Sequence, residues 1–152
     1  MKKVVYVDMD NVIVDFESGV NRLTPEQRTS YADRLDEVPG IFALMDPIED
    51  AVASVRTLCA KFDVYILSTA PWANPSAWSD KVEWIHRHFG SHEGTHLYKR
   101  LILTHHKNLN EGDFLIDDRT KNGADRFNGI HIHFGQPNWP NWKTVVEYLM
   151  DL

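Results

Sequence analysis

The sequence contains little cysteine, no excess of basic residues and no long apolar run. Its one cysteine, Cys59, cannot form an internal disulfide, which excludes a disulfide-stapled secreted domain. Lys and Arg number 16 against 22 Asp and Glu, and the net charge of −6 does not favour binding to a nucleic-acid polymer. No apolar stretch approaches the roughly 20 residues that cross a bilayer. Met1-Lys2-Lys3 leads directly into the first predicted strand, so we expect no signal sequence. We therefore expect a cytoplasmic protein with no membrane partner.

The segments that are present predict one α/β domain. A chain of 152 residues is the usual size of a single domain. Strand-like apolar segments alternate with helix-like ones, which predicts a mostly parallel sheet covered on both faces. The predicted strands span residues 3–8, 62–67, 101–103, 114–116 and 130–134. The predicted helices span residues 12–23, 46–61, 76–89 and 142–150.

The helix predicted over residues 46–61 has a clear start signal. We expect Asp46 as its N-cap, Pro47 in its first turn and Glu49 three residues after the cap. Cys59 falls on the apolar face of this helix, which predicts a buried thiol without a catalytic role.

The segment between residues 24 and 44 is polar and only weakly periodic, and it contains two prolines and one glycine. This composition suits a short helical excursion better than a core element. We therefore predict a single domain over residues 1–152 with a small cap at about residues 16–45.

Two carboxylates, Asp8 and Asp10, stand where the first apolar strand stops. Like charges held this close are costly unless a cation or a shared proton relieves them, so the pair indicates a metal site or an acid/base pair. The alternative is that both are turn residues that end the strand, because Asp is common in turns.

Other polar side chains follow the later predicted strands, and the carboxyl ends of parallel strands meet at one edge of a sheet. Thr69 follows the second strand, Lys107 the third, and Asp117 with Asp118 the fourth. Taken singly, each also fits a cap or a solvated loop residue. Together with Asp8 and Asp10 they suit Mg²⁺ and a phosphate group.

The chemistry of this set is that of phosphate-ester hydrolysis. Mg²⁺ takes oxygen ligands such as Asp8 and Asp117, while Lys107 and the Thr69 hydroxyl can hold phosphate oxygens. One carboxylate can attack phosphorus to give an aspartyl phosphate, and a second can protonate the departing oxygen and later activate water. The eight histidines lack cysteine partners and zinc-like spacing, so they do not predict a histidine metal centre.

The order of these motifs resembles that of the haloacid dehalogenase (HAD) superfamily. The residues in and around the motifs resemble those of the cytosolic type C 5'(3')-deoxyribonucleotidase family. Four segments carry the resemblance: Asp-Met-Asp-Asn-Val at 8–12, Asp-Phe-Glu at 15–17, Leu-Thr at 103–104 leading to Lys107, and Leu-Ile-Asp-Asp-Arg at 115–119. The resemblance implies a HAD-like three-layer Rossmannoid parallel sheet with a small helical cap inserted after the first strand. Asn11 stands where many relatives have Gly, a replacement that Asn tolerates because it also accepts unusual backbone angles.

The resemblance also implies roles for individual residues. Asp8 is the expected nucleophile and Asp10 the expected acid/base, with the Asp10 backbone carbonyl reaching the metal. The remaining expected residues bind phosphate (Thr69, Ala70, Lys107), metal (Asp8, Asp10, Asp117, Asp118) or substrate (Phe16, Arg119).

These expectations define a Mg²⁺-dependent phosphomonoesterase for nucleoside monophosphates, with a deoxyribonucleotide as the expected small-molecule partner. A phosphatase for another phosphorylated metabolite is one alternative, and a phospho-acceptor signalling module is a second. The expected cap has no tryptophan, so base-stacking surface would come from Tyr31, Phe42, Trp72 or Trp78. The sequence leaves the oligomeric state open, a homodimer being one option.

Overall fold

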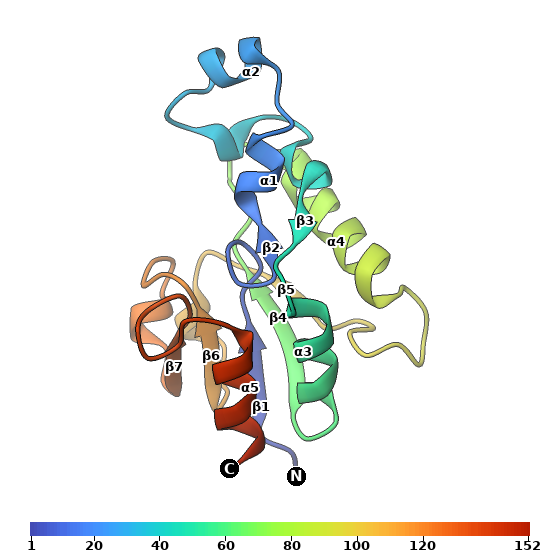
Figure 1. Ribbon diagram of the computed structural model, residues 1–152, viewed down its shortest axis with the longest axis vertical. Helices are drawn as coiled ribbons and strands as arrows, with labels where there is room; N and C mark the ends of the chain where they lie inside the picture. The colour runs from blue at the N-terminus through green and yellow to red at the C-terminus, as the bar shows by residue number, and fades with distance from the viewer.

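A computed structural model describes all residues, 1–152, and its centre is a parallel sheet of five strands (Figure 1). The strand order is β5-β4-β1-β6-β7, so β1 lies in the middle of the sheet. The strands are β1 (Val4–Val7), β4 (Asp63–Ser68), β5 (Leu101–Leu103), β6 (Phe114–Asp117) and β7 (Ile130–His133). This order makes β4 and β6 the two neighbours of β1, which brings the carboxyl ends of all three together.

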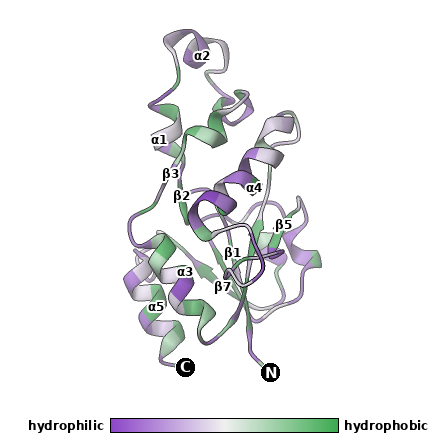
Figure 2. Ribbon diagram, turned by 90° about the vertical axis from the view of Figure 1, so that its right-hand side faces the viewer, coloured by the Kyte–Doolittle hydropathy of each residue, from purple (hydrophilic) through white to green (hydrophobic).

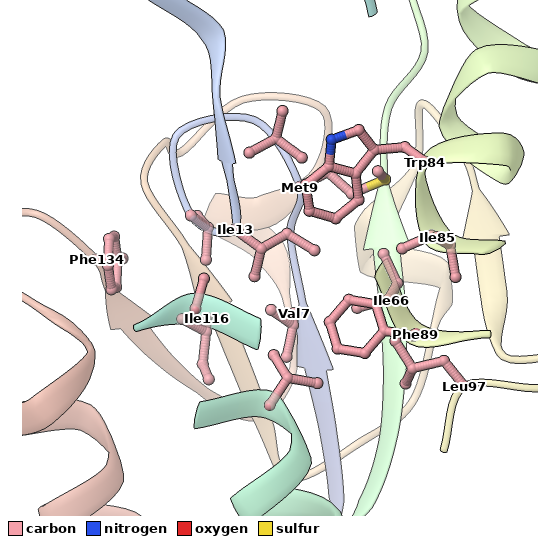
Figure 3. Close-up of a cluster of buried hydrophobic side chains, with 14 of the residues drawn as sticks. Val7, Met9, Ile13, Ile66, Trp84, Ile85, Phe89, Leu97, Ile116 and Phe134 are labelled. Atoms are coloured by element: carbon pink, nitrogen blue, oxygen red, sulfur yellow. The ribbon is translucent and has the colours of Figure 1, made fainter. Parts of the chain in front are cut away.

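The main core lies between one face of the sheet and three helices, α3 (Ala51–Cys59), α4 (Pro75–Phe89) and α5 (Trp142–Met150). Figure 3 shows Val7, Ile66 and Ile116, from three adjacent strands, in one cluster with Trp84 and Phe89 of α4. Full burial of such a side chain stabilises the fold by roughly 1.5 to 3 kcal/mol. This packed layer fixes the strand ends on which the polar residues stand.

The opposite face of the sheet has a thinner cover. Side chains that alternate with the main core form a second, smaller cluster there with Ala124 and Phe127, namely Tyr6, Leu67 and Leu115. The cover comes from a segment that contains two short 3₁₀ helices, η3 (Lys107–Leu109) and η4 (Ala124–Arg126), and no long helix. The sheet is therefore covered on both faces, but unequally.

A short antiparallel pair, β2 (Val14–Asp15) and β3 (Asp46–Pro47), separates residues 16–45 from the sheet. The insert contains α1 (Phe16–Val20), α2 (Pro25–Ser30), η1 (Leu35–Glu37) and η2 (Ile41–Leu44). It stands at the end of the molecule opposite the two termini (Figure 1), and α2 carries mostly hydrophilic residues (Figure 2). We refer to residues 16–45 as the cap.

Helix α4 ties the cap to the sheet. It packs against η2, and the Trp84 indole N–H donates to the Met45 carbonyl at 3.0 Å. At its start, the Asn74 amide donates to the carbonyls of Asp36 and Val38 at 2.9 and 3.0 Å. The position of the cap over the strand ends is therefore fixed by buried hydrogen bonds.

The predictions of a helix starting at residue 12 and of a helix starting at Asp46 are wrong. The N–H groups of Val12, Ile13 and Val14 all donate hydrogen bonds to the Met9 carbonyl. These bonds form a tight turn before β2. Asp46 belongs to β3 and accepts a hydrogen bond from Arg22 at 2.8 Å. Pairing between segments more than 30 residues apart outweighs the local capping signal, since β2 and β3 can form only together.

Helix α3 instead begins at Ala51, after Asp50 in a left-handed conformation (φ 66°) and without a side-chain cap. Cys59, its last residue, is half-buried rather than buried, and it is a free thiol. Burial raises the pKa of this thiol above its usual value, which keeps it uncharged. The predictions for residues 101–103, 76–89 and 142–150 are confirmed to within one residue. None of the helices combines the length and apolar character needed to cross a bilayer.

Candidate active site

A small polar recess lies at the carboxyl edge of the sheet. It has a volume of about 30 Å³, and its lining residues are Asp8, Asp10, Thr69, Lys107, Asp117, Arg119, Lys121 and Asn122. The recess therefore brings together side chains that follow four different strands. All the residues expected to act in catalysis or to bind phosphate or metal line this recess, except Ala70 and Asp118.

The loop after β1 sets the two carboxylates at the recess. The Asp8 N–H donates to the Ile116 carbonyl of β6 at 2.9 Å, which anchors the nucleophile candidate to the sheet. Asn11 then adopts a left-handed conformation (φ 62°), and its N–H donates to the Val14 carbonyl at 2.7 Å. This sharp turn places Asp10 beside Asp8 instead of on a continuing strand.

Lys107 joins the carboxylates of two strands. Its Nζ lies 3.1 Å from Asp8 Oδ1 and 2.5 Å from Asp117 Oδ2, and the residue is 3% exposed. Burial opposes the charge of Lys107, but Asp8 and Asp117 outweigh it and raise the lysine pKa above its usual 10.5. Lys107 is therefore a fixed cation at physiological pH.

Gly123 allows the chain to pass close to Lys107. It has φ +84°, and a Cβ built there would meet the Lys107 backbone nitrogen at 3.0 Å and the Asn108 nitrogen at 2.9 Å. We expect Gly123→Ala to displace Lys107 and to lower both activity and the free energy of unfolding. Gly135→Ala is the matched control, because Gly135 has φ +89° but no neighbour within 4 Å, so only the backbone strain of about 1 to 2 kcal/mol applies. Equal losses in the two variants, measured by thermal unfolding and turnover, would contradict this explanation.

Asp8, Asp117 and Asp118 form an oxygen-rich cluster, in which one oxygen from each lies within 4.8 Å of the others. Asp118 Oδ1 is buried and has no hydrogen-bond partner in the protein. Burial and the neighbouring charge of Asp8 raise the pKa of Asp117 to about 6 and that of Asp118 to about 7. The carboxylate oxygens are hard donors, one of them has no partner, and the three carboxylates repel one another. These features fit a divalent cation such as Mg²⁺.

Thr69 and Ala70 follow β4, and Thr69 lines the recess. The Thr69 hydroxyl donates to the Thr104 carbonyl at 2.7 Å, so its proton is already engaged. The backbone N–H groups of Thr69 and Ala70 donate to no group of the protein. Backbone donors at this position, with the Lys107 ammonium, can bind an anion.

The recess opens into a larger cleft of about 510 Å³ that lies under the cap. The cleft and the recess share four residues, which are Asp10, Thr69, Arg119 and Asn122. The cap contributes Phe16 and Phe42, whose rings meet edge to face at 6.0 Å. Both residues expected near the substrate, Phe16 and Arg119, line this cleft.

Of the four aromatic residues considered for stacking, Phe42 alone lines the cleft. Trp72 is 82% exposed, and both Trp72 and Trp78 pack against His105, with ring centroids 6.1 and 6.0 Å away. Tyr31 packs under the Arg34 guanidinium. The cap therefore places a half-buried Phe16 on the cleft, with Phe42, which is only 3% exposed, packed edge to face behind it.

Sequence reasoning missed three residues that support the site. Lys81, 1% exposed on α4, forms an ion pair with Asp10. His131 and His133 on β7 share hydrogen bonds of 3.0 and 2.9 Å with the Asp117 and Asp118 carbonyls. Lys81 lies three and four residues before the buried Trp84 and Ile85, on a helix face that is otherwise apolar. This spacing could have indicated that Lys81 is buried.

Solved structures define the fold. The chain superposes on the magnesium-bound crystal structure of YfnB from Bacillus subtilis, provisionally classed as a HAD-hydrolase, with a TM-score of 0.57. The match covers 97% of this chain and 98% of that one at 10% identity, so it speaks for the fold alone. Together with the parallel sheet flanked by helices, it defines an α/β HAD-like fold.

Sequence comparisons then give the family. The model of "5' nucleotidase, deoxy (Pyrimidine), cytosolic type C protein" matches residues 17–145. A protein of Vibrio phage KVP40, provisionally named 5'(3')-deoxyribonucleotidase, is 55% identical over 97% of this chain and 85% of its own length. The human 5'(3')-deoxyribonucleotidase, cytosolic type, is 28% identical over 93% of this chain and 78% of its own. The chain belongs to this HAD family and is a phosphoric monoester hydrolase of the 5'-nucleotidase type.

Proposed function

We propose that the protein is a Mg²⁺-dependent 5'(3')-deoxyribonucleotidase that hydrolyses nucleoside monophosphates through an aspartyl phosphate on Asp8. The observation that carries the proposal is the meeting of Asp8, Asp10 and Lys107 in a recess at the base of a cap-covered cleft. The cleft volume of about 510 Å³ lies within the range of pockets for ligands of nucleotide size. The printed names of the relatives support the same substrate class.

In the first step, an Asp8 carboxylate oxygen attacks phosphorus and forms an O–P bond while the ester P–O bond breaks. Asp10 gives its proton to the departing oxygen, so the nucleoside leaves as a neutral alcohol. Burial raises the Asp10 pKa above its usual 3.8 although Lys81 opposes the shift, which favours a carboxyl group able to donate.

In the second step, water attacks the phosphorus of the aspartyl phosphate and Asp10 takes the water proton. The Asp8–phosphate bond breaks, which releases inorganic phosphate and restores both carboxyl groups. Lys107 and the N–H groups of Thr69 and Ala70 stabilise the charge on the phosphate oxygens in both steps.

Asp8, Asp117 and Asp118, with the Asp10 backbone carbonyl, would hold the Mg²⁺ ion. When bound, Mg²⁺ offsets the negative charge that the carboxylates and the phosphate bring together. A small-molecule substrate, the acidic net charge and the free Cys59 thiol are consistent with the cytoplasmic location that we include in the proposal.

Mg²⁺ binding should strengthen as pH rises from about 5 to about 8, because protons compete for Asp117 and Asp118. Their raised pKa values, about 6 and about 7, mean that the metal-free fold binds more protons than the unfolded chain. Its stability should accordingly fall as pH rises through that window, and Mg²⁺ should restore it. We expect a larger Mg²⁺-induced gain in Tm at about pH 8 than at about pH 5. An equal gain at both, with ionic strength matched by NaCl, would contradict the assignment.

A panel of phosphomonoesters assayed with Mg²⁺ tests the proposed substrate class. It should contain deoxynucleoside 5'- and 3'-monophosphates, ribonucleoside monophosphates and sugar phosphates. We expect the highest kcat/KM for deoxynucleoside monophosphates. No preference for nucleotides over sugar phosphates would instead support a phosphatase for another metabolite.

A further inference from the structure

Lys121 lines the recess, and the chemistry above gives it no role. Four of the eight residues that line the recess also line the cleft. The other four line the recess alone, and they are Asp8, Lys107, Asp117 and Lys121. The first three are the expected nucleophile, the phosphate-binding lysine and a metal ligand. Lys121 therefore lies at the end of the site where the phosphate would react, and not at the end that would hold the nucleoside.

The backbone of Lys121 is tied to that of Lys107. The Lys107 N–H donates to the Asn122 carbonyl at 2.8 Å, and the Ala124 N–H donates to the Lys121 carbonyl at 3.0 Å. Asn122 and Gly123 adopt left-handed conformations (φ 55° and 84°), which turn the chain directly after Lys121. These bonds and this turn set the position from which the Lys121 side chain reaches the recess.

The Lys121 ammonium has no ion-pair partner, in contrast to that of Lys107. Lys107 Nζ lies within 3.1 Å of both Asp8 and Asp117, so two carboxylates balance its charge. Lys121 is exposed, and no carboxylate oxygen lies within 4.0 Å of its Nζ. Arg119, the third cation of the recess, also lines the cleft. Lys121 is therefore the one cation that lines only the recess and has no carboxylate partner.

A phosphate ester brings negative charge to a recess that already contains the carboxylates of Asp8, Asp10 and Asp117. Its non-bridging oxygens accept hydrogen bonds, and positively charged donors bind them most strongly. A lysine ammonium has three donors and no acceptor, so Lys121 can bind one of these oxygens without a strict orientation. Because the partner would be the phosphate itself, this contact does not depend on the base or the sugar.

We propose that Lys121 is a phosphate-binding residue: its ammonium donates to a non-bridging oxygen of the substrate phosphate in the recess and holds inorganic phosphate there before release. This inference rests on the proposed function, because it assigns Lys121 to the phosphate of the same substrate. Lys121 supplements Lys107, whose charge is shared between two carboxylates. It strengthens the binding of every phosphomonoester and of the phosphate product.

The test is a charge series in which Lys121→Arg keeps the positive charge, Lys121→Met removes it and Lys121→Glu reverses it. With Mg²⁺ present, kcat/KM is measured for a deoxynucleoside monophosphate and for p-nitrophenyl phosphate, which has no nucleoside. The inhibition constant of inorganic phosphate is measured in the same assay. We expect Lys121→Met to lower both kcat/KM values and the affinity for phosphate by about 10-fold, the usual size of a charge-assisted hydrogen bond. Lys121→Glu should lose more, and Lys121→Arg should stay within about threefold of wild type.

Lys143→Met is the matched control, because Lys143 is an exposed lysine of α5 outside both the recess and the cleft. It changes the net charge by the same amount as Lys121→Met and should keep the wild-type values. Equal losses in the two variants would reveal an effect of net charge alone and would overturn the inference. A misfolded fraction lowers kcat/KM but leaves the inhibition constant of phosphate unchanged, so that constant separates phosphate binding from a loss of folding.

Three results would overturn the inference and leave the proposed function intact. They are wild-type values in Lys121→Met, a loss confined to the nucleotide, and losses that do not follow the order of charge. Failure of the wild-type protein to hydrolyse the nucleotide would instead overturn the proposed function. Hydrolysis of p-nitrophenyl phosphate and its inhibition by phosphate would then still decide the role of Lys121. Failure to hydrolyse either substrate would overturn both.

Discussion

Asp8→Asn should reduce turnover of a deoxynucleoside monophosphate on the order of 10⁴-fold or more, since an amide cannot form the O–P bond. The fold should survive the change. Asp8 repels Asp117 and Asp118 and raises the pKa of both, so the neutral amide removes repulsion from the metal-free cluster. Phosphate release by a purified sample, with thermal unfolding in parallel, is the measurement.

Asp125→Asn is the matched control for this change, because Asp125 is an exposed aspartate of η4 outside both the recess and the cleft. It should hydrolyse the nucleotide at the wild-type rate. Substantial activity of Asp8→Asn under conditions in which Asp125→Asn is fully active would refute the assignment of Asp8 as nucleophile.

Asp10→Asn should lower kcat/KM for the nucleotide by about 10² to 10⁴-fold, the usual contribution of a positioned acid or base. Its effect on metal binding should be small, because the expected Mg²⁺ ligand at this residue is the backbone carbonyl. The variant thus separates proton transfer from metal binding. Turnover and the Mg²⁺-induced gain in Tm are measured on the same sample.

Asp118→Asn gives the opposite pattern and completes this comparison. Removing one charge from the cluster should reduce the Mg²⁺-induced gain in Tm, because Asp118 brings an unpartnered buried oxygen to it. An Asp10→Asn variant that loses the gain in Tm as fully as Asp118→Asn would mean that the Asp10 carboxylate itself binds the metal.

The convergence of the polar residues was predictable from the sequence because it depends on a general property of parallel sheets. Once Asp8, Lys107 and Asp117 are each assigned to the end of a strand, the common direction of the strands brings them to one edge. The structure places the Lys107 Nζ within 3.1 Å of both carboxylates. No distance information was needed to expect that these side chains share one edge.

Local signals failed where long-range pairing decided the structure. The Asp-Pro-x-Glu pattern at residues 46–49 is a typical helix start, yet Asp46 pairs with Asp15 in the antiparallel pair β2–β3. The Ile48 N–H also donates to the Ile13 carbonyl at 2.8 Å. Neither contact can be predicted from a short stretch of sequence, because the partners are more than 30 residues apart.

Lys81 was missed for a related reason. Lysine on a helix is normally a solvated residue, and its partner Asp10 lies 71 residues earlier in the chain. The spacing to Trp84 and Ile85 put Lys81 on the buried face, but only the tertiary structure, which brings α4 to the loop after β1, identifies what it binds. Which of the four candidate aromatic residues lines the cleft also depends on tertiary packing. The sequence alone therefore did not distinguish Phe42 from the other three.

Rapid quenching of the protein during turnover tests the central claim most directly. The protein is mixed with Mg²⁺ and a deoxynucleoside monophosphate carrying a radiolabelled phosphate, quenched in acid and digested for peptide mapping. The expected result is label on the peptide that contains Asp8, and none when Asp8→Asn is treated in the same way. Release of labelled phosphate over many turnovers with no label on that peptide at any quench time would contradict hydrolysis through Asp8.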